Sequence, residues 1–153
     1  MSRILEAVEQ FLDGDDWKYQ AVDGRSALRF GVSGEHGKLD CLAIADESRD
    51  LFRFYTVLPV MAPLSQRHLI AELLTRINYS LLVGNFELDM GDGEIRYKTT
   101  ADFENVDVSP SVVKNAIYWN ISTADRYLPA VMKVLYANLS PEAALEVPPA
   151  RAD

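Results

Sequence analysis

Apolar side chains recur every three or four residues over residues 3–12, and this run stops at Gly14. Such spacing predicts a short amphipathic helix. From Trp17 onward the period changes to two, which is the alternation of a half-buried strand. The alternation predicts a short entry segment over residues 17–21. Three strands follow it, over residues 28–32, 38–45 and 51–58. Turn-forming residues separate these segments, so we expect an antiparallel meander.

The predicted strand over residues 51–58 carries apolar bulk on both of its faces. A strand of this kind lies in the centre of a sheet or contributes to an interface. We therefore take three of its aromatic residues as candidate contacts for a partner protein: Phe52, Phe54 and Tyr55.

Two prolines, Pro59 and Pro63, indicate a loop after this strand. Ser65 is a suitable N-cap for a following helix, whose apolar stripe runs over residues 69–82. Gly84 then stands where a helix commonly ends, at the C′ position.

Strand-like alternation returns over residues 86–90 and 95–99. Asp92 and Gly93 lie between these two runs and form a typical hairpin turn. The second half of the chain therefore adds one more hairpin to the sheet.

A long helix is predicted to begin at Ser109 as the N-cap, with Pro110 at the first helical position. Its apolar stripe runs as far as Leu135. Pro129 lies inside this span, where its ring clashes with the carbonyl of Asp125 and removes one hydrogen bond. We expect a kink or a break there, at a cost of about 3 kcal/mol unless packing offsets it.

This order of elements predicts an α+β fold, in which an antiparallel sheet is flanked by three helices in the order α-β-β-β-α-β-β-α. The length predicts a single domain, which we place over residues 1–140. Residues 141–153 hold three prolines and little apolar bulk. They are interpreted as a C-terminal tail.

The charge of the chain argues against binding to nucleic acid. It has 15 Lys and Arg against 23 Asp and Glu, a formal charge of −8, whereas a phosphate backbone attracts the opposite sign. The basic residues that could still form a local patch fall on different predicted strands and turns: Arg25, Arg29, Lys38, Arg49 and Arg53.

No apolar run approaches the roughly 18 residues that a membrane-spanning helix needs, and the N-terminal segment lacks the apolar stretch of a signal peptide. We expect a cytoplasmic protein with no membrane contact. Cys41 is the only cysteine, which excludes a disulfide within the chain and a zinc site of several thiolates. It is interpreted as a small buried hydrophobic residue.

The sequence offers little that could carry chemistry. His68 and Glu72 have helical spacing that could hold two metal ligands, but two are too few, and both His36 and His68 are interpreted as solvated. The acidic run over residues 13–16 lacks the spacing of a calcium loop. No phosphate-binding glycine loop and no nucleophilic serine elbow occurs. We expect no catalytic residue, no metal and no cofactor.

Several segments of the second half carry a family resemblance: Asn78-Tyr79, residues 84–87, residues 92–98, residues 122–129 and residues 140–144. Together they resemble the signature of the YbjN-like family of bacterial proteins, named for sensory transduction regulation. The resemblance implies a fold like that of type III secretion chaperones, in which homodimers are common. It also implies a non-enzymatic role linked to stress response or signalling, with a protein partner.

The residues that match the family are interpreted mainly as structural: Asn78, Tyr79, Gly84, Phe86, Tyr97, Tyr127 and Pro129. Asn78 lies beside an apolar stripe, and if it is buried its amide must bond to the backbone of a strand or loop. Contact with a ligand is the alternative for Asn78. A binding platform is the alternative for the aromatic residues.

The leading hypothesis is a protein-binding module that forms a homodimer. Besides the aromatic residues of the strand over 51–58, we expect Tyr118 and Trp119 on the last helix to contact a partner. The rival hypothesis is a small-molecule sensor or an enzyme, with a pocket between the sheet and the helices. A DNA-binding regulator is third, because it requires a basic patch.

Overall fold

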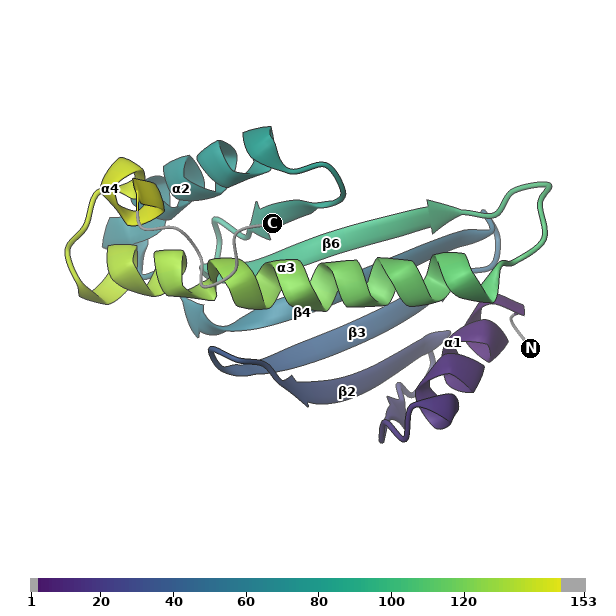
Figure 1. The fold of residues 1–153 in the computed structure, drawn as a ribbon. Coiled ribbons are helices and arrows are strands. Elements are labelled where there is room, and N and C mark those ends of the chain that lie inside the picture. The colour runs from purple at the N-terminus through teal and green to yellow at the C-terminus, as the bar shows by residue number, and fades with distance from the viewer. Residues whose placement is uncertain (1–2, 147–153) are drawn as a thin grey trace.

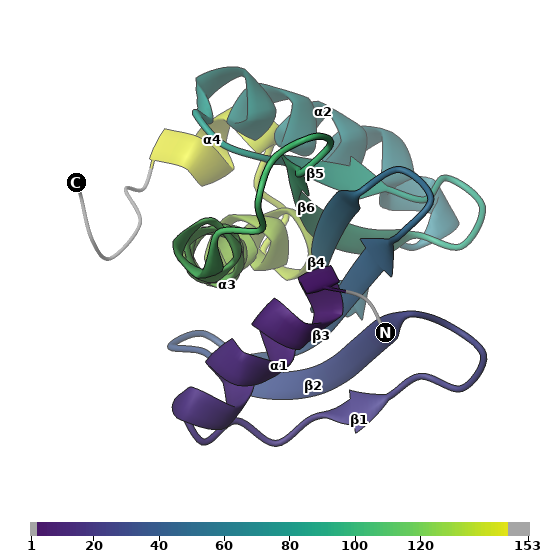
Figure 2. The same cartoon turned by 90° about the vertical axis from the view of Figure 1, so that its right-hand side faces the viewer.

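The computed structural model describes residues 3–146 and shows a six-stranded antiparallel sheet packed against helices (Figure 1). The strands lie in the order β1-β2-β3-β4-β6-β5, and α1 and α3 lie on the same face of this sheet (Figure 2). The predicted α+β class is therefore confirmed. The elements are α1 (Arg3–Gly14), β1 (Gln20–Ala21), β2 (Ala27–Ser33), β3 (Lys38–Asp46), β4 (Leu51–Met61), α2 (Arg67–Ser80), β5 (Asn85–Leu88), β6 (Glu94–Asp102), α3 (Pro110–Tyr136) and α4 (Pro141–Glu146).

β4 lies between β3 and β6, in the central position that its two apolar faces predict. Its alternate residues Phe52 and Phe54 point into the core beneath the helices and are completely buried. Tyr55 points to the other face, where it is also buried and the Arg96 guanidinium lies 4.1 Å from its ring centroid. The apolar bulk on both faces of this strand thus reflects a central position.

The loop expected at Pro59 is wrong, because β4 continues through this proline to Met61. A proline cannot donate a hydrogen bond to a neighbouring strand. The strand accommodates it with a register shift against β6 between Val57 and Met61, so that no ladder bond is required from Pro59.

Both expected ends of α2 also differ from the sequence prediction. Ser65 lies in a short 3-10 helix, Leu64–Gln66, and the N-cap of α2 is Gln66, which makes no side-chain cap. The helix ends at Ser80, so Gly84 is not its C′ residue. Gly84 has φ +71° just before β5, and a Cβ atom there would lie 2.5 Å from the Lys98 carbonyl oxygen. The glycine is needed for this close approach to β6, and not to end the helix.

α3 begins as the sequence predicts, since the Ser109 side chain accepts a hydrogen bond from the Val112 N–H and Pro110 follows it. The helix then runs through Pro129 without a break (Figure 1). The first part of the expected tail is helical too: residues 141–146 form α4, in which Pro141 and Ala144 are buried. The rest of the expected tail, residues 147–153, lies outside the described residues.

Asn78 joins α2 to β5. Its side-chain oxygen accepts the Phe86 N–H at 2.8 Å, and its side-chain nitrogen donates to the Phe86 carbonyl at 3.1 Å. Asn78 is half-buried, and its amide makes the contacts with a strand backbone that the sequence suggested. They fix the start of the edge strand β5 to the end of α2.

We predict that Asn78→Ala lowers the free energy of unfolding by about 2 kcal/mol, because both backbone groups of Phe86 lose their partner. Urea unfolding followed by circular dichroism measures this. The matched control is Asn115→Ala on the exposed side of α3. It should change the stability by no more than about 0.5 kcal/mol. Equal effects of the two substitutions would contradict the assignment.

Candidate partner-binding surfaces and the docked turn

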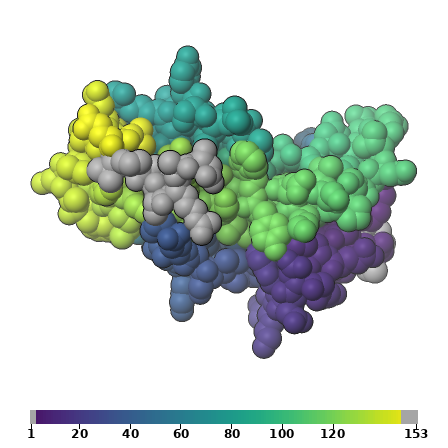
Figure 3. Space-filling model, in the orientation of Figure 1, coloured from purple at the N-terminus to yellow at the C-terminus, as the bar shows by residue number. Residues whose placement is uncertain are grey.

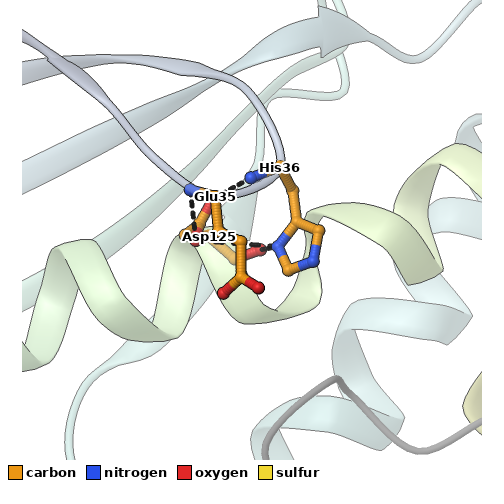
Figure 4. A group of neighbouring side chains, drawn as sticks. All are labelled: Glu35, His36 and Asp125. Carbon is orange, nitrogen blue, oxygen red and sulfur yellow. Dashed lines mark hydrogen bonds and ion pairs between the residues drawn. The ribbon is translucent and has the colours of Figure 1, made fainter.

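The turn between β2 and β3 is held on α3 by one carboxylate. The Asp125 side chain accepts the N–H of Glu35 at 3.0 Å and the N–H of His36 at 2.9 Å (Figure 4). Gly34 leaves room for this carboxylate, since a Cβ atom at residue 34 would lie 2.3 Å from Asp125 Oδ1. These hydrogen bonds join the turn to a helix residue that lies 90 positions after Glu35 and 89 positions after His36 in the chain.

Pro129 explains why the helix has a second acceptor at the same place. A proline has no N–H, so the carbonyl of the residue four positions earlier, Asp125, loses its helical donor. His36 Nδ1 lies 3.1 Å from that carbonyl oxygen and supplies the missing hydrogen bond. His36, interpreted from the sequence as solvated, is therefore bound to the helix.

Glu35, His36 and Asp125 each offer a metal-ligand atom within 4.8 Å of the others. The sequence did not suggest this group, because only the fold brings the turn to the helix. Both Asp125 oxygens already accept main-chain hydrogen bonds. We therefore assign the cluster a structural role in docking the turn.

Tyr97 lies at the centre of a polar network between the sheet and the helices. Its hydroxyl donates to the Val83 carbonyl and also bonds with the Thr123 and Trp119 side chains. Burial raises the pKa of Tyr97, and the bonds with Thr123 and Trp119 partly oppose this shift. Tyr97 and Asn78, the residues for which a ligand contact was an alternative, thus use their polar groups within the protein.

Two further aromatic residues of the family motif, Phe86 and Tyr127, pack beside Tyr97. Phe86 contacts both Tyr97 and Tyr127 edge-on, with ring centroids 4.8 and 6.0 Å apart. Cys41 is buried as expected, and burial raises the pKa of its thiol to about 12. The thiol therefore stays protonated at neutral pH, which makes it a poor nucleophile.

The structure separates the five residues predicted to contact a partner. Phe52, Phe54 and Tyr55 are buried, which removes them from the surface that a partner could touch. Tyr118 and Trp119 are 40% and 45% exposed. The Tyr118 hydroxyl donates to the Asp15 carboxylate, so its side chain is tied to the end of α1.

Apolar side chains that the sequence did not single out for binding are exposed at the end of α2 and in the loop after it. Tyr79 is 94% exposed at the end of α2, and Leu82 is 89% exposed in the following loop. Val83 in the same loop and Trp119 on α3 both bond to the Tyr97 hydroxyl, so loop and helix meet there. We call Tyr79, Leu82, Val83 and Trp119 the α2–α3 surface; both helices lie on the face drawn in Figure 3.

A family model described as "Putative bacterial sensory transduction regulator" matches residues 5–133. The chain belongs to the YbjN family. The crystal structure of YbjN from E. coli is similar, with a TM-score of 0.57, 18% identity and coverage of 88% of this chain and 90% of that one. The HopA1-SchA chaperone-effector complex contains a similar chain, with a TM-score of 0.54, 13% identity and coverage of 81% and 93%. None of the curated proteins compared matches the chain.

At these identities the two solved structures establish the fold alone, and they agree with the chaperone-like fold expected from the YbjN resemblance. Among the described residues, no helix is long and apolar enough to cross a membrane. Most of the YbjN motif has a structural explanation, since Asn78 and Phe86 join α2 to β5 and Asp125 and Pro129 dock the turn. Tyr79 is the exception, because the fold leaves its side chain in solvent.

We predict that His36→Ala destabilises the protein by about 1 kcal/mol when Pro129 is present and by close to nothing in Pro129→Ala protein. The reason is that alanine restores a helical N–H for the Asp125 carbonyl, which then no longer needs His36. Urea unfolding of the four proteins of this double-mutant cycle measures the coupling. His68→Ala is the matched control, because His68 is exposed on α2, and it should have no effect in either background. A cost of His36→Ala that is the same in both backgrounds would refute the account.

Proposed function

We propose that this chain is a non-enzymatic, protein-binding regulatory module with a chaperone-like role. The family is described as a regulator, and the fold is similar to a chain of a chaperone-effector complex. We place its action in the bacterial cytoplasm, in stress response or signalling. Two internal hydrogen-bond networks, around Asn78 and Tyr97, favour this proposal over a sensor or enzyme with a pocket between sheet and helices.

The observation that carries the proposal is the exposure of Tyr79. This residue belongs to the YbjN motif, yet its ring lies in solvent and makes no hydrogen bond with the described residues. Tyrosine is favoured at binding hot spots, since it combines a large apolar ring with a polar group. Leu82, three residues later in the chain, is exposed too, and exposed apolar area of this kind is typical of a partner contact.

Nucleic acid is not the partner in this proposal. The net charge is −8, and Arg29 is paired with Asp40. Arg25 and Arg53 line one surface depression, but Asp46 and Glu47 line it too. The cations there are balanced by carboxylates, so this depression is not a basic patch.

We predict that Tyr79→Ala weakens capture of the partner by at least about tenfold, because a buried tyrosine at a hot spot contributes about 2 kcal/mol or more. A photo-crosslinking residue at position 82 identifies the partner in cells, and the purified partner is then titrated against each variant. Tyr136→Ala is the matched control, since Tyr136 is exposed near the end of α3. Both substitutions should leave the free energy of unfolding within about 0.5 kcal/mol of the parent. Equal partner binding by the two variants would count against the α2–α3 surface.

We also propose that the chain forms a homodimer, as is common in this fold. Sedimentation velocity at micromolar concentration should show a species of twice the 17.1 kDa chain mass. A single species at the mass of one chain over the whole concentration range would exclude the dimer.

A further inference from the structure

β2 has a partner strand along only part of its outer side. β1 contributes two residue pairs, Gln20 with Arg29 and Ala21 with Leu28, and the pairing stops there. Figure 2 shows β1 beside one part of β2 only. In the described part of the chain, the last residues of β2 therefore form a free strand edge.

The direction of the backbone groups on this edge follows from the neighbouring hydrogen bonds. The Ala27 carbonyl accepts from the Val22 N–H on the β1 side, whereas the Ser26 carbonyl accepts from β3. Because the direction alternates along a strand, Gly31 and Ser33 point their N–H and C=O groups to the same side as Ala27. These groups have no strand partner within the described residues, and we call residues 31–33 the β2 edge.

Basic side chains surround the β2 edge although the whole protein is acidic. Lys18 and Arg29 line a surface pocket of about 380 Å³ together with Gly31 and Asp40. Arg29 is paired with Asp40, but Lys18 makes no ion pair with the described residues. Lys38 pairs with Ser33 in the sheet register, and its ammonium group is also unpaired there.

We infer that the β2 edge takes up an extended acidic segment of a partner protein, which pairs its backbone with Gly31 and Ser33. This inference rests on the proposed protein-binding function and adds the site and the chemistry of the bound segment. An exposed strand edge supplies main-chain hydrogen bonds to a peptide, and the neighbouring side chains supply specificity. Lys18 and Lys38, whose ammonium groups make no ion pair with the described residues, here select carboxylates.

The two sides of an added strand meet different surroundings. On the open face of the sheet lie Lys18, Lys38 and the Arg29–Asp40 pair, and on the helix side lies the buried Phe30 ring. Since side chains alternate along a strand, the bound segment should alternate acidic and apolar residues. A second copy would bring its own Lys18 and Lys38 to the junction, so the local charge favours an acidic segment over the β2 edge of another copy.

The test uses the full chain and a labelled nine-residue peptide in which valine alternates with glutamate. Fluorescence anisotropy measures its affinity, and ¹⁵N NMR locates it. We expect the largest amide shifts at Gly31 and Ser33, and a loss of binding when the peptide amides that face β2 are N-methylated. Methylation of the intervening amides is the matched control and should leave binding intact. Shifts that centre on the α2–α3 surface, or no binding of the peptide, would overturn the inference.

Two protein variants separate charge from backbone pairing. Lys18→Glu should weaken binding of the peptide about tenfold, whereas Lys114→Glu on α3 should not. Gly31→Pro removes the N–H donor and should abolish binding, with circular dichroism to verify its fold. If a cellular partner binds Gly31→Pro and Lys18→Glu as tightly as the parent, the inference fails while the proposed function stands. If the peptide binds at Gly31 but photo-crosslinking recovers no cellular partner, the proposed function fails, and the assignment of a partner's segment to the β2 edge fails with it.

Discussion

The position of the β2–β3 turn on α3 depends on a hydrogen bond that the helix cannot make within itself. Pro129 leaves the main-chain carbonyl of Asp125 without a helical donor. The side-chain carboxylate of Asp125 is a second hydrogen-bond acceptor at the same place. The β2–β3 turn meets both needs with the His36 ring and two main-chain N–H groups. A proline that is costly in an isolated helix is therefore part of a tertiary contact here, and this contact sets where the tip of the β2–β3 hairpin lies on α3.

The second constraint is that α1 and α3 cover the same face of the sheet (Figure 2). Side chains of the central strand β4 that point to this face, such as Phe52 and Phe54, are buried in the core and cannot contact a partner. The opposite face keeps charged pairs such as Arg29 with Asp40, and one buried ring, Tyr55, beneath Arg96. Aromatic content in a central strand consequently says little about binding, and the surfaces that can meet a partner lie on helix ends, loops and the sheet edge.

Much of the fold follows from local signals in the sequence. Periodicity identifies the main helices and strands, and Ser109 with Pro110 marks the start of α3, since these features depend on neighbouring residues alone. The misassigned positions depend on distant residues. Gly84 is required by its approach to β6, Pro59 is tolerated because of a register shift, and His36 is held by a helix 89 residues later. No local pattern contains that information. The exposure of Tyr79, in the last turn of α2, likewise depends on how the helix packs in the fold.

The division between buried and exposed motif residues bears on how such a domain can serve different partners. Asn78, Phe86, Asp125 and Pro129 each have a task in holding the fold, so their presence in a family member says nothing about what it binds. Tyr79 has no such task, and its exposed ring, with the exposed Leu82 three residues later, suits contact with a partner. The β2 edge offers the complementary chemistry, backbone hydrogen bonds and cations. A partner that used both would be recognised by apolar anchoring at one site and by an extended acidic strand at the other, and neither contact would require the core to change.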